Sequence, residues 1–356
     1  MSEFAVTIEQ IEKTWPIEGA DMIELAKVTR FAYQFVVRKG SFKPNDLVVF
    51  IPIESVIPPA VIEKLGMTGK FSGKNCDRVK TKKFKGQISE GFATSIESLI
   101  DFMPIYSPAY SMAQLSVGLD ITALLGIVKF EPPVIEDKSG NLLPLPPGVA
   151  HYDIESCDRN LDIVNLLLDR PVRILEKLEG QNASIQYKTD GTVYVSQRNF
   201  TIEELPDKEH AFWKLCRNNG YLETAKNLCE IYGEDVLIRF EYLGPAIQKN
   251  IYKLNAPVAR VFDIMVGRRY LNGYEFLSQC ANFQLITAPV LASDVILKDW
   301  LTRRTMQEAS NGESMLFKTK REGIVITPMI EEYNQKIGRL FLKQRSPEYK
   351  ATSELE

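Results

Sequence analysis

The sequence has little of what several classes of enzyme and membrane protein need. Its only two histidines, His151 and His210, stand far apart, so a histidine pair or a Ser-His-Asp relay has little to work with. The five cysteines are scattered and include no CxxC pair, which argues against a disulfide framework or a zinc cluster and favours buried free thiols. No run approaches the roughly 20 apolar residues of a membrane-spanning helix, and the first residues do not resemble a signal peptide. We therefore expect a soluble protein that is cytoplasmic or otherwise intracellular.

The chain also lacks an excess of positive charge. Its 43 Lys and Arg residues face 46 Asp and Glu residues, a net charge of -3, so a nucleic-acid partner would have to bind a local basic patch. One such segment carries Arg78, Lys80, Lys82, Lys83 and Lys85. The alternation between positions 78 and 82 predicts cations on one face of a strand. On charge alone, this face is equally typical of an RNA-binding surface and of a solvated edge strand that resists aggregation.

Short β-type runs with turn signals between them fill residues 1–130, for example residues 47–53, and one short helix is expected at residues 60–65. The series predicts a small OB-like β-barrel, a fold that commonly binds single-stranded or distorted nucleic acid. Residues 131–149 are rich in proline, and we interpret them as a linker between two domains.

The second predicted domain, residues 150–356, mixes helical and strand patterns. Residues 209–232 and 293–308 are typical of helices, whereas residues 236–242 and 323–327 are typical of strands. The sequence therefore predicts an α+β domain after the barrel.

Two KxxG sequences in this domain are candidates for a nucleotide-binding nucleophile. The one that starts at Lys188 is nearer to the KxDG signature of covalent nucleotidyltransferases. However, Asp190 and Gly191 stand between two alternating runs, which is a strong hairpin signal. Lys188 would then lie at a solvated hairpin tip, where its amine stays protonated and is a poor nucleophile.

Lys177, in the other KxxG sequence, ends an apolar run and enters a turn that contains Gly180. A glycine there lets the backbone approach a phosphate closely. The hairpin would also fold Arg198 back beside Lys177. We therefore predict Lys177 as the nucleophile, although Glu179 stands where Asp is commoner in the signature.

Six motifs follow one another in the order typical of the covalent nucleotidyltransferases, which comprise ATP-dependent DNA ligases, RNA ligases and mRNA capping enzymes. They lie at residues 176–182, 196–199, 239–248, 260–264, 321–326 and 342–346. DNA ligases and capping enzymes carry an OB domain after the catalytic domain, whereas here the OB-like region comes first. The chain thus resembles the RNA ligase family with an N-terminal OB domain, RNA ligase family 5 type. The resemblance implies sealing of 3′-OH/5′-phosphate breaks in duplexed RNA.

The same resemblance implies a role for each motif residue. The catalytic residues would be Lys177, which carries AMP derived from ATP, together with Arg198 and Lys343. The ATP and AMP site would also contain Glu176, Asn182, Glu241, Phe262, Glu322 and Arg345. Within that site, Glu241 would bind ribose and Phe262 would stack on adenine. Glu179 and Glu322 would serve Mg²⁺ or Mn²⁺.

Other interpretations stay open at this point. Phe262 could be ordinary core, and Arg198 could pair with a carboxylate at the hairpin base. The whole chain could be a capping-type guanylyltransferase, although this leaves the leading OB domain unexplained. A catalytically idle RNA-binding protein would have no use for the intact set of motif residues, and a DNA ligase would differ only in the sugar at the break. We expect an ATP-dependent RNA ligase that acts as a monomer on nicked duplex RNA with 3′-OH and 5′-phosphate ends.

Overall fold

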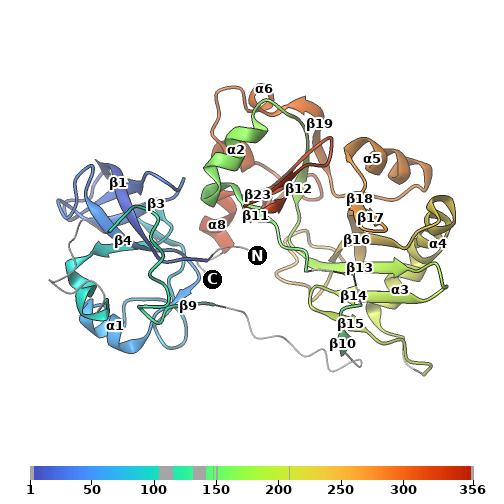
Figure 1. The fold of residues 1–356 in the computed structure, drawn as a ribbon, viewed down its shortest axis with the longest axis horizontal. Helices are drawn as coiled ribbons and strands as arrows, with labels where there is room; N and C mark the ends of the chain where they lie inside the picture. The colour runs from blue at the N-terminus through green and yellow to red at the C-terminus, as the bar shows by residue number, and fades with distance from the viewer. Residues whose placement is uncertain are drawn as a thin grey trace. The chain divides into compact units, whose positions relative to one another are not determined.

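The computed structural model describes residues 4–103, 115–130, 142–146, 148–149, 151–207 and 209–353, with side chains to residue 350. The chain is divided into two compact units (Figure 1). The first unit consists of Met1–Val134, Cys157–Leu161 and Lys350–Glu356, and the second of Ile135–Ser156 and Asp162–Tyr349. Most of the predicted linker lies outside the described residues. Its last part forms β10 (Leu142–Pro144), so the second unit's sheet begins inside the segment that the sequence analysis treats as a linker.

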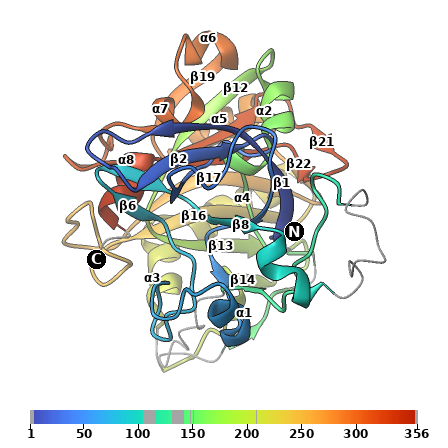
Figure 2. The same cartoon turned by 90° about the vertical axis from the view of Figure 1, so that its left-hand side faces the viewer.

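A five-stranded antiparallel sheet forms the first unit, in the order β3-β2-β1-β4-β8. Its strands are β1 (Thr7–Pro16), β2 (Ile23–Val28), β3 (Gln34–Arg38), β4 (Leu47–Ile51) and β8 (Phe92–Ser95). Figure 2 labels three of these strands, β1, β2 and β8. A bulge between Ile11 and Lys13 lets β1 pair with β2 along one half and with β4 along the other. The backbone of Glu90 donates a hydrogen bond to the carbonyl of Gln34, so β3 also reaches the segment before β8. The sheet is therefore curled, as the predicted barrel requires.

Smaller elements complete the first unit. They are β5 (Ser55–Val56), α1 (Pro59–Lys64), β6 (Lys82–Phe84), β7 (Gln87–Ser89), a 3-10 helix (Glu97–Phe102) and β9 (Val128–Lys129). The helix predicted at residues 60–65 is thus confirmed. Within β4, Val48 and Phe50 join one apolar cluster and Val49 and Ile51 join another, so this strand is buried on both faces.

The prediction that the basic segment forms one regular strand is wrong for its first half. The backbone of Arg78 bonds instead to Ser72, and its guanidinium lies 3.5 Å from the centre of the Phe130 ring. Only from Lys82 onward does the segment form a strand, β6, and Lys80 and Lys82 are half-buried. Lys83 and Lys85 are the exposed cations of the set.

Buried charges hold the two later segments of the chain in the first unit. The Nζ atom of Lys350 lies 2.6 Å from Glu90 Oε1 and 3.7 Å from Asp158 Oδ2, and all three side chains are buried. Next to them, Arg159 donates a hydrogen bond to the hydroxyl of Tyr33, and burial raises the pKa of Tyr33 to about 12. An isolated charge would be costly here, so the pairing explains why these segments fold with the first unit.

The second unit contains two main sheets, as the α+β prediction requires. The seven-stranded sheet has the order β10-β15-β14-β13-β16-β17-β18, and the five-stranded sheet has the order β11-β23-β20-β12-β19. The strands after β10 are β11 (Glu155–Ser156), β12 (Pro171–Lys177), β13 (Gln181–Tyr187), β14 (Val193–Gln197), β15 (Phe200–Ile202), β16 (Val236–Leu243), β17 (Val258–Val266), β18 (Arg269–Tyr270), β19 (Val290–Ile296), β20 (Gly323–Pro328) and β23 (Leu342–Arg345). A separate pair joins β21 (Tyr333–Asn334) to β22 (Gly338–Arg339).

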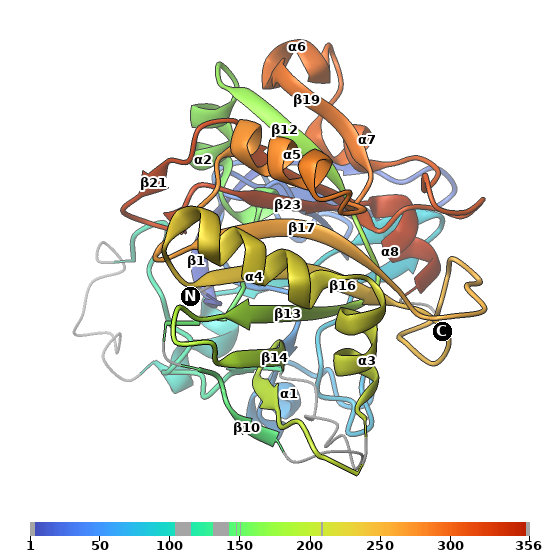
Figure 3. The same cartoon turned by 90° about the vertical axis from the view of Figure 1, so that its right-hand side faces the viewer.

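Helices cover one face of the seven-stranded sheet (Figure 3). The helices of this unit are α2 (Leu161–Leu167), α3 (Ala211–Asn218), α4 (Tyr221–Tyr232), α5 (Gly273–Asn282), α6 (Leu297–Leu301) and α7 (Met306–Ser310), and α8 (Pro347–Ser353) follows β23. Strand residues that point toward α3, α4 and α5, such as Ala183, Ile185 and Phe240, form the main core. The opposite face is polar, because Asn182 pairs with Glu241 and their side chains alternate with the apolar ones. This polar face carries several of the predicted site residues.

The helix predicted over residues 293–308 is wrong at its start. Residues up to Ile296 belong to β19, which pairs with β12, and only then do α6 and α7 follow. The β-branched pair Val295 and Ile296 suits a strand, and Thr305 begins a new helix with a capping box to Glu308. Among the described residues, no helix has the length and apolar character needed to cross a membrane.

Candidate active site

Lys177 is the last residue of β12, and residues from two later motifs surround its amine. Its Nζ atom lies 2.7 Å from Glu322 Oε1, and the two side chains are 22% and 11% exposed. Arg345, at the end of β23, places its Nε 3.5 Å from the same oxygen. These contacts follow from strand register, because Lys177 and Arg345 both pair with Gly323, the first residue of β20. Three motifs that are far apart in the sequence therefore meet at one point.

The turn after Lys177 fits tightly against β16. A Cβ atom on Gly180 would lie 2.5 Å from Leu243 Cδ2, 2.7 Å from Glu241 Cγ and 2.7 Å from the carbonyl oxygen of Tyr242. Contacts this short do not occur between real atoms, so only glycine fits. The KxxG glycine is thus required by the packing of the turn on β16, a reason that the sequence alone did not reveal.

Glu179, inside the same turn, forms hydrogen bonds to three other residues. Its Oε1 accepts a hydrogen bond from the backbone of Lys249 at 2.9 Å, and its Oε2 accepts one from the hydroxyl of Tyr349 at 2.5 Å. The backbone N–H of Glu179 donates to the hydroxyl of Tyr252 at 2.8 Å. In this arrangement Glu179 anchors the turn. Of the two carboxylates predicted to serve a metal, Glu322 is the one that contacts Lys177.

Glu176, on the other side of Lys177, has an unused acceptor. Its side chain is 1% exposed, and its Oε2 accepts a hydrogen bond from the backbone of Met315 at 2.8 Å. Its Oε1 is buried and has no hydrogen-bond partner among the described residues. Burial raises the pKa of Glu176, and the neighbouring Ser314 hydroxyl and Met315 N–H oppose the rise. A buried acceptor without a donor is costly, and a ligand that supplies an N–H group would remove this cost.

Phe262 lies beside the apolar cluster that flanks the Lys177 motif. Phe240 pairs with Val261 and Arg239 with Asp263, so Phe262 is the extra residue of a bulge in β17. The half-buried ring packs against a cluster that includes Leu175 and Leu178. A bulge of this kind redirects a side chain that a regular strand would place in register.

Comparison with known families decides the identity of the chain. Residues 5–96 match the model of an OB-fold domain, and residues 170–344 match the model of the RNA ligase family. An RNA ligase mutant from Naegleria gruberi, solved with AMP and Mn, superposes with a TM-score of 0.80 at 25% sequence identity and covers 99% of this chain and 100% of its own. The chain belongs to the ATP-dependent RNA ligases that carry an N-terminal OB domain.

Two further structures of the Naegleria gruberi RNA ligase show the same fold. The ligase with PPi and a mutant with ATP and Mn each superpose with a TM-score of 0.79 at 24% identity and cover 99% of this chain and 100% of their own. Comparison with curated protein sequences gave no match. The predicted RNA ligase with a leading OB domain is therefore confirmed at the level of family and fold.

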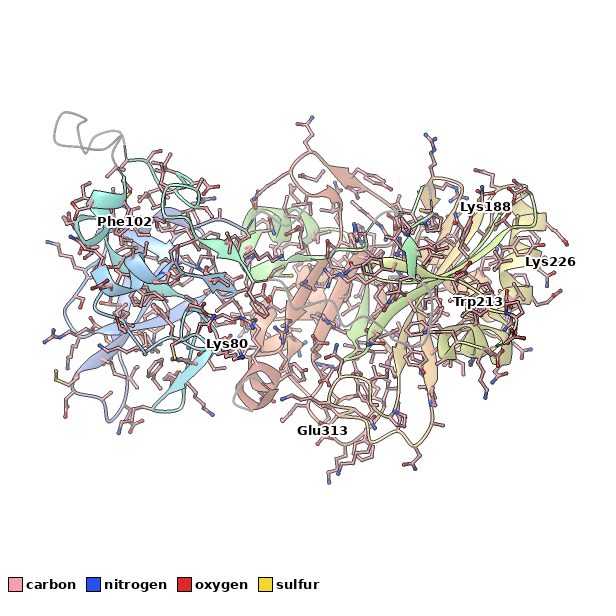
Figure 4. All side chains as sticks on the ribbon, turned by 90° about the horizontal axis from the view of Figure 1, so that it is seen from below. Lys80, Phe102, Lys188, Trp213, Lys226 and Glu313 are labelled. Carbon is pink, nitrogen blue, oxygen red and sulfur yellow. The ribbon has the colours of Figure 1, made fainter. Side chains whose placement is uncertain are left out.

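The second KxxG lysine of this ligase lies where the hairpin prediction puts it. Strands β13 and β14 pair up to Tyr187 and Val193, and Lys188 bonds across the turn to Thr192. Near the tip, Lys188 Nζ has Asp190 Oδ2 at 3.7 Å, and the two side chains are 33% and 60% exposed. Figure 4 marks Lys188 on the second unit. Lys177 is more enclosed and has a closer carboxylate.

The other predicted site residues of the ligase lie on neighbouring elements. Asn182 is opposite Glu241 on the polar face, and Lys343 is opposite Val325 in β23. Arg198 forms an ion pair with Asp153, and its charge also acts on Glu241. Sequence reasoning missed the groups that hold Glu179. Tyr252 follows soon after the third motif, but Tyr349 has no recognisable signal in the sequence.

Glu241 gives the ligase a pH-dependent stability. Burial is the main cause that raises its pKa to about 8, Glu322 raises it further, and Lys177 and Arg198 oppose the rise. The folded protein thus binds a proton here that the unfolded chain releases near pH 4.5. The resulting stability is present at low pH and is lost as the pH rises through about 8.

We therefore expect Glu241→Gln to remove part of the pH dependence of the unfolding free energy. The unfolding free energy of the variant, relative to that of wild type, should rise by on the order of 2–3 kcal/mol from pH 5 to pH 9, because glutamine does not ionise. Urea unfolding at a series of pH values measures this difference. Glu230→Gln, at an exposed position of α4, is the control. Parallel pH curves for Glu241→Gln and wild type would contradict the prediction.

Proposed function

We propose that this ligase seals 3′-OH/5′-phosphate breaks in duplexed RNA through a covalent AMP adduct on Lys177 and an adenylylated 5′ end. The observation that carries the proposal is the contact of 2.7 Å between Lys177 Nζ and Glu322 Oε1, with Arg345 at the same oxygen. An enclosed amine with a fixed direction suits attack on a phosphate, whereas the amine of Lys188 is at a hairpin tip.

Three displacements account for the reaction. Lys177 Nζ attacks the α-phosphorus of ATP, so an N–P bond forms and the bond to pyrophosphate breaks. An oxygen of the RNA 5′-phosphate then attacks the adduct and releases the lysine. Finally the 3′-OH attacks the 5′-phosphorus and AMP departs. Each step concentrates negative charge on phosphate oxygens, which Arg198, Lys343 and Arg345 would neutralise. Glu322 Oε1, at 2.7 Å, would orient Nζ and accept its proton.

The buried acceptor on Glu176 supports ATP over GTP. Adenine presents an amine at its six position, and guanine presents a carbonyl oxygen there. The unpaired Oε1 of Glu176 would accept from the amine and repel the carbonyl. Phe262 would stack on the adenine, and Asn182 and Glu241 would face the ribose. This favours the ligase over a capping-type guanylyltransferase.

ATP and a divalent metal, Mg²⁺ or Mn²⁺, are the cofactors of the ligase. Among the described residues, no group of three or more His, Cys, Asp or Glu side chains forms a metal cage. Glu322 would therefore hold the ion with few protein ligands, and Glu179 would support it through the turn. A site of this kind leaves most positions to water and phosphate, as Mg²⁺ prefers. When bound, the metal neutralises phosphate oxygens.

We assign residues 1–130 to an OB-like RNA-binding domain and residues 150–356 to the nucleotidyltransferase domain, joined by the linker at 131–149. RNA is the substrate, and Lys83 and Lys85 are the exposed members of the basic segment that would contact it. Arg78, Lys80 and Lys82 would contribute positive charge from half-buried positions. The enzyme would act as a monomer inside the cell, where ATP and RNA are found.

Sealing of matched nicked duplexes tests the proposal. We expect the purified protein with Mg²⁺ to retain label from α-labelled ATP after denaturation, and to seal a nick flanked by RNA at least about tenfold faster than the same nick in DNA. Preferential retention of label from α-labelled GTP would instead favour the capping enzyme. RNA binding without retained label would favour an idle binding protein, and equal sealing of the DNA nick would favour a DNA ligase.

A further inference from the structure

Two loops of the second unit attach to the nucleophile motif on either side of Lys177. Loop A is residues 244–257, between β16 and β17, and loop B is residues 311–322, between α7 and β20. Loop A reaches the motif through the bond from Lys249 to Glu179, and loop B through the bond from Met315 to Glu176. Anything bound to both loops would therefore lie close to the reacting amine.

Loop B presents apolar groups to solvent. Leu316 packs against the apolar cluster next to Lys177, while its neighbours Met315 and Phe317 are 64% and 37% exposed. The Nζ atom of Lys253, from loop A, lies 5.5 Å from the centre of the Phe317 ring. An aromatic ring with a lysine above it is the arrangement with which proteins bind single-stranded or terminal bases.

Positive charge dominates the exposed part of the loops. Loop A contains Lys249 and Lys253 and no acidic residue. In loop B, Lys318 is exposed, and Lys320 pairs with Glu348 at 2.7 Å. The acidic residues of loop B are Glu322, which faces Lys177, and Glu313, which is exposed and labelled in Figure 4. The surface is therefore complementary to a phosphate backbone.

Loop A also has a fixed, unusual shape. Four residues that are not glycine adopt left-handed conformations there, Ala246, Gln248, Asn250 and Lys253, with φ between 44° and 61°. Such conformations cost free energy and persist only where the surroundings hold them. One stabilising contact is the hydrogen bond that the hydroxyl of the buried Tyr252 accepts from the backbone of Glu179.

We propose that Met315, Phe317, Lys253 and Lys318 form a docking surface for the substrate RNA beside the nucleotide site. Phe317 stacks on a base next to the break, and the lysines contact the neighbouring phosphates. The inference rests on RNA ligation as the function, but it concerns binding, which can be measured without ATP and without sealing.

Equilibrium binding of a fluorescent nicked RNA duplex at several salt concentrations tests this surface. We expect Phe317→Leu, which keeps an apolar side chain but loses the ring, to weaken binding about tenfold, and Phe317→Tyr to stay within about twofold of wild type. The Lys253→Ala/Lys318→Ala double variant should weaken binding about tenfold and lower the slope of log K against log salt by about 1.5. All three variants should still retain AMP from ATP.

The matched control is the Lys188→Ala/Lys226→Ala double variant, in which both lysines lie on other parts of the second unit (Figure 4). It should bind RNA as wild type does. The docking surface is refuted if Phe317→Leu binds like wild type, or if the loop lysines matter no more than the control pair. Wild-type protein that binds RNA but retains no AMP would refute the proposed function and leave the binding result to be judged separately.

Discussion

Lys177→Ala is expected to retain no AMP on the denatured protein, a loss of at least about a thousandfold relative to wild type. Alanine has no nucleophile, and the next lysine of the same type, Lys188, is at a hairpin tip and cannot reach the same phosphate without breaking the pairing of β13 and β14. Incubation with α-labelled ATP and Mg²⁺, followed by denaturing electrophoresis, measures the retained label.

Lys188→Ala is the matched control for this experiment. Its side chain pairs only loosely with Asp190 at 3.7 Å, so its loss should leave labelling within about twofold of wild type. If label disappeared in Lys188→Ala and remained in Lys177→Ala, the assignment of the nucleophile would be wrong. RNA binding by both variants would show that neither loss reflects unfolding.

The hairpin on which the choice between the two lysines depends could be predicted from sequence because a hairpin follows local rules. A short Asp-Gly turn between alternating runs specifies a hairpin with little help from the rest of the chain, and β13 and β14 pair as predicted. The order of the motifs likewise assigned Glu322 and Arg345 to the same predicted nucleotide site as Lys177, and the strand register brings the three residues together.

What could not be predicted depends on tertiary contacts. The sequence predicts that Glu179 serves the metal, but it does not predict that the two oxygens of Glu179 bond to Lys249 and Tyr349, which come from distant segments. The basic segment has the alternation of a strand, but Arg78 bonds to Ser72 instead, because the local pattern does not specify its partner. The exposed ring of Phe317 gave no signal at all, since an aromatic residue in a polar loop has no periodicity to read.

Gly180→Ala should slow self-adenylylation about a hundredfold, although the substitution adds a single methyl group. The new Cβ would lie 2.5 Å from Leu243 Cδ2 and 2.7 Å from the carbonyl oxygen of Tyr242. The leucine side chain can rotate away, but the carbonyl belongs to the backbone of β16 and is held by the sheet, so the turn itself must shift. A displacement of about 1 Å at a reacting group can cost about a hundredfold in rate. The shift of the turn should therefore displace Lys177 and slow its reaction.

Gly191→Ala, in the other KxxG sequence, separates this effect from the general cost of replacing a glycine. No atom lies within 4 Å of the Cβ position at Gly191, but its φ of +84° strains alanine. We expect this variant to lose about 1 kcal/mol of stability and to keep the wild-type rate within about twofold. Single-turnover labelling, with thermal unfolding of both variants in parallel, distinguishes the two outcomes. A normal rate in Gly180→Ala would mean that the turn tolerates the shift and that the fit against β16 does not position Lys177.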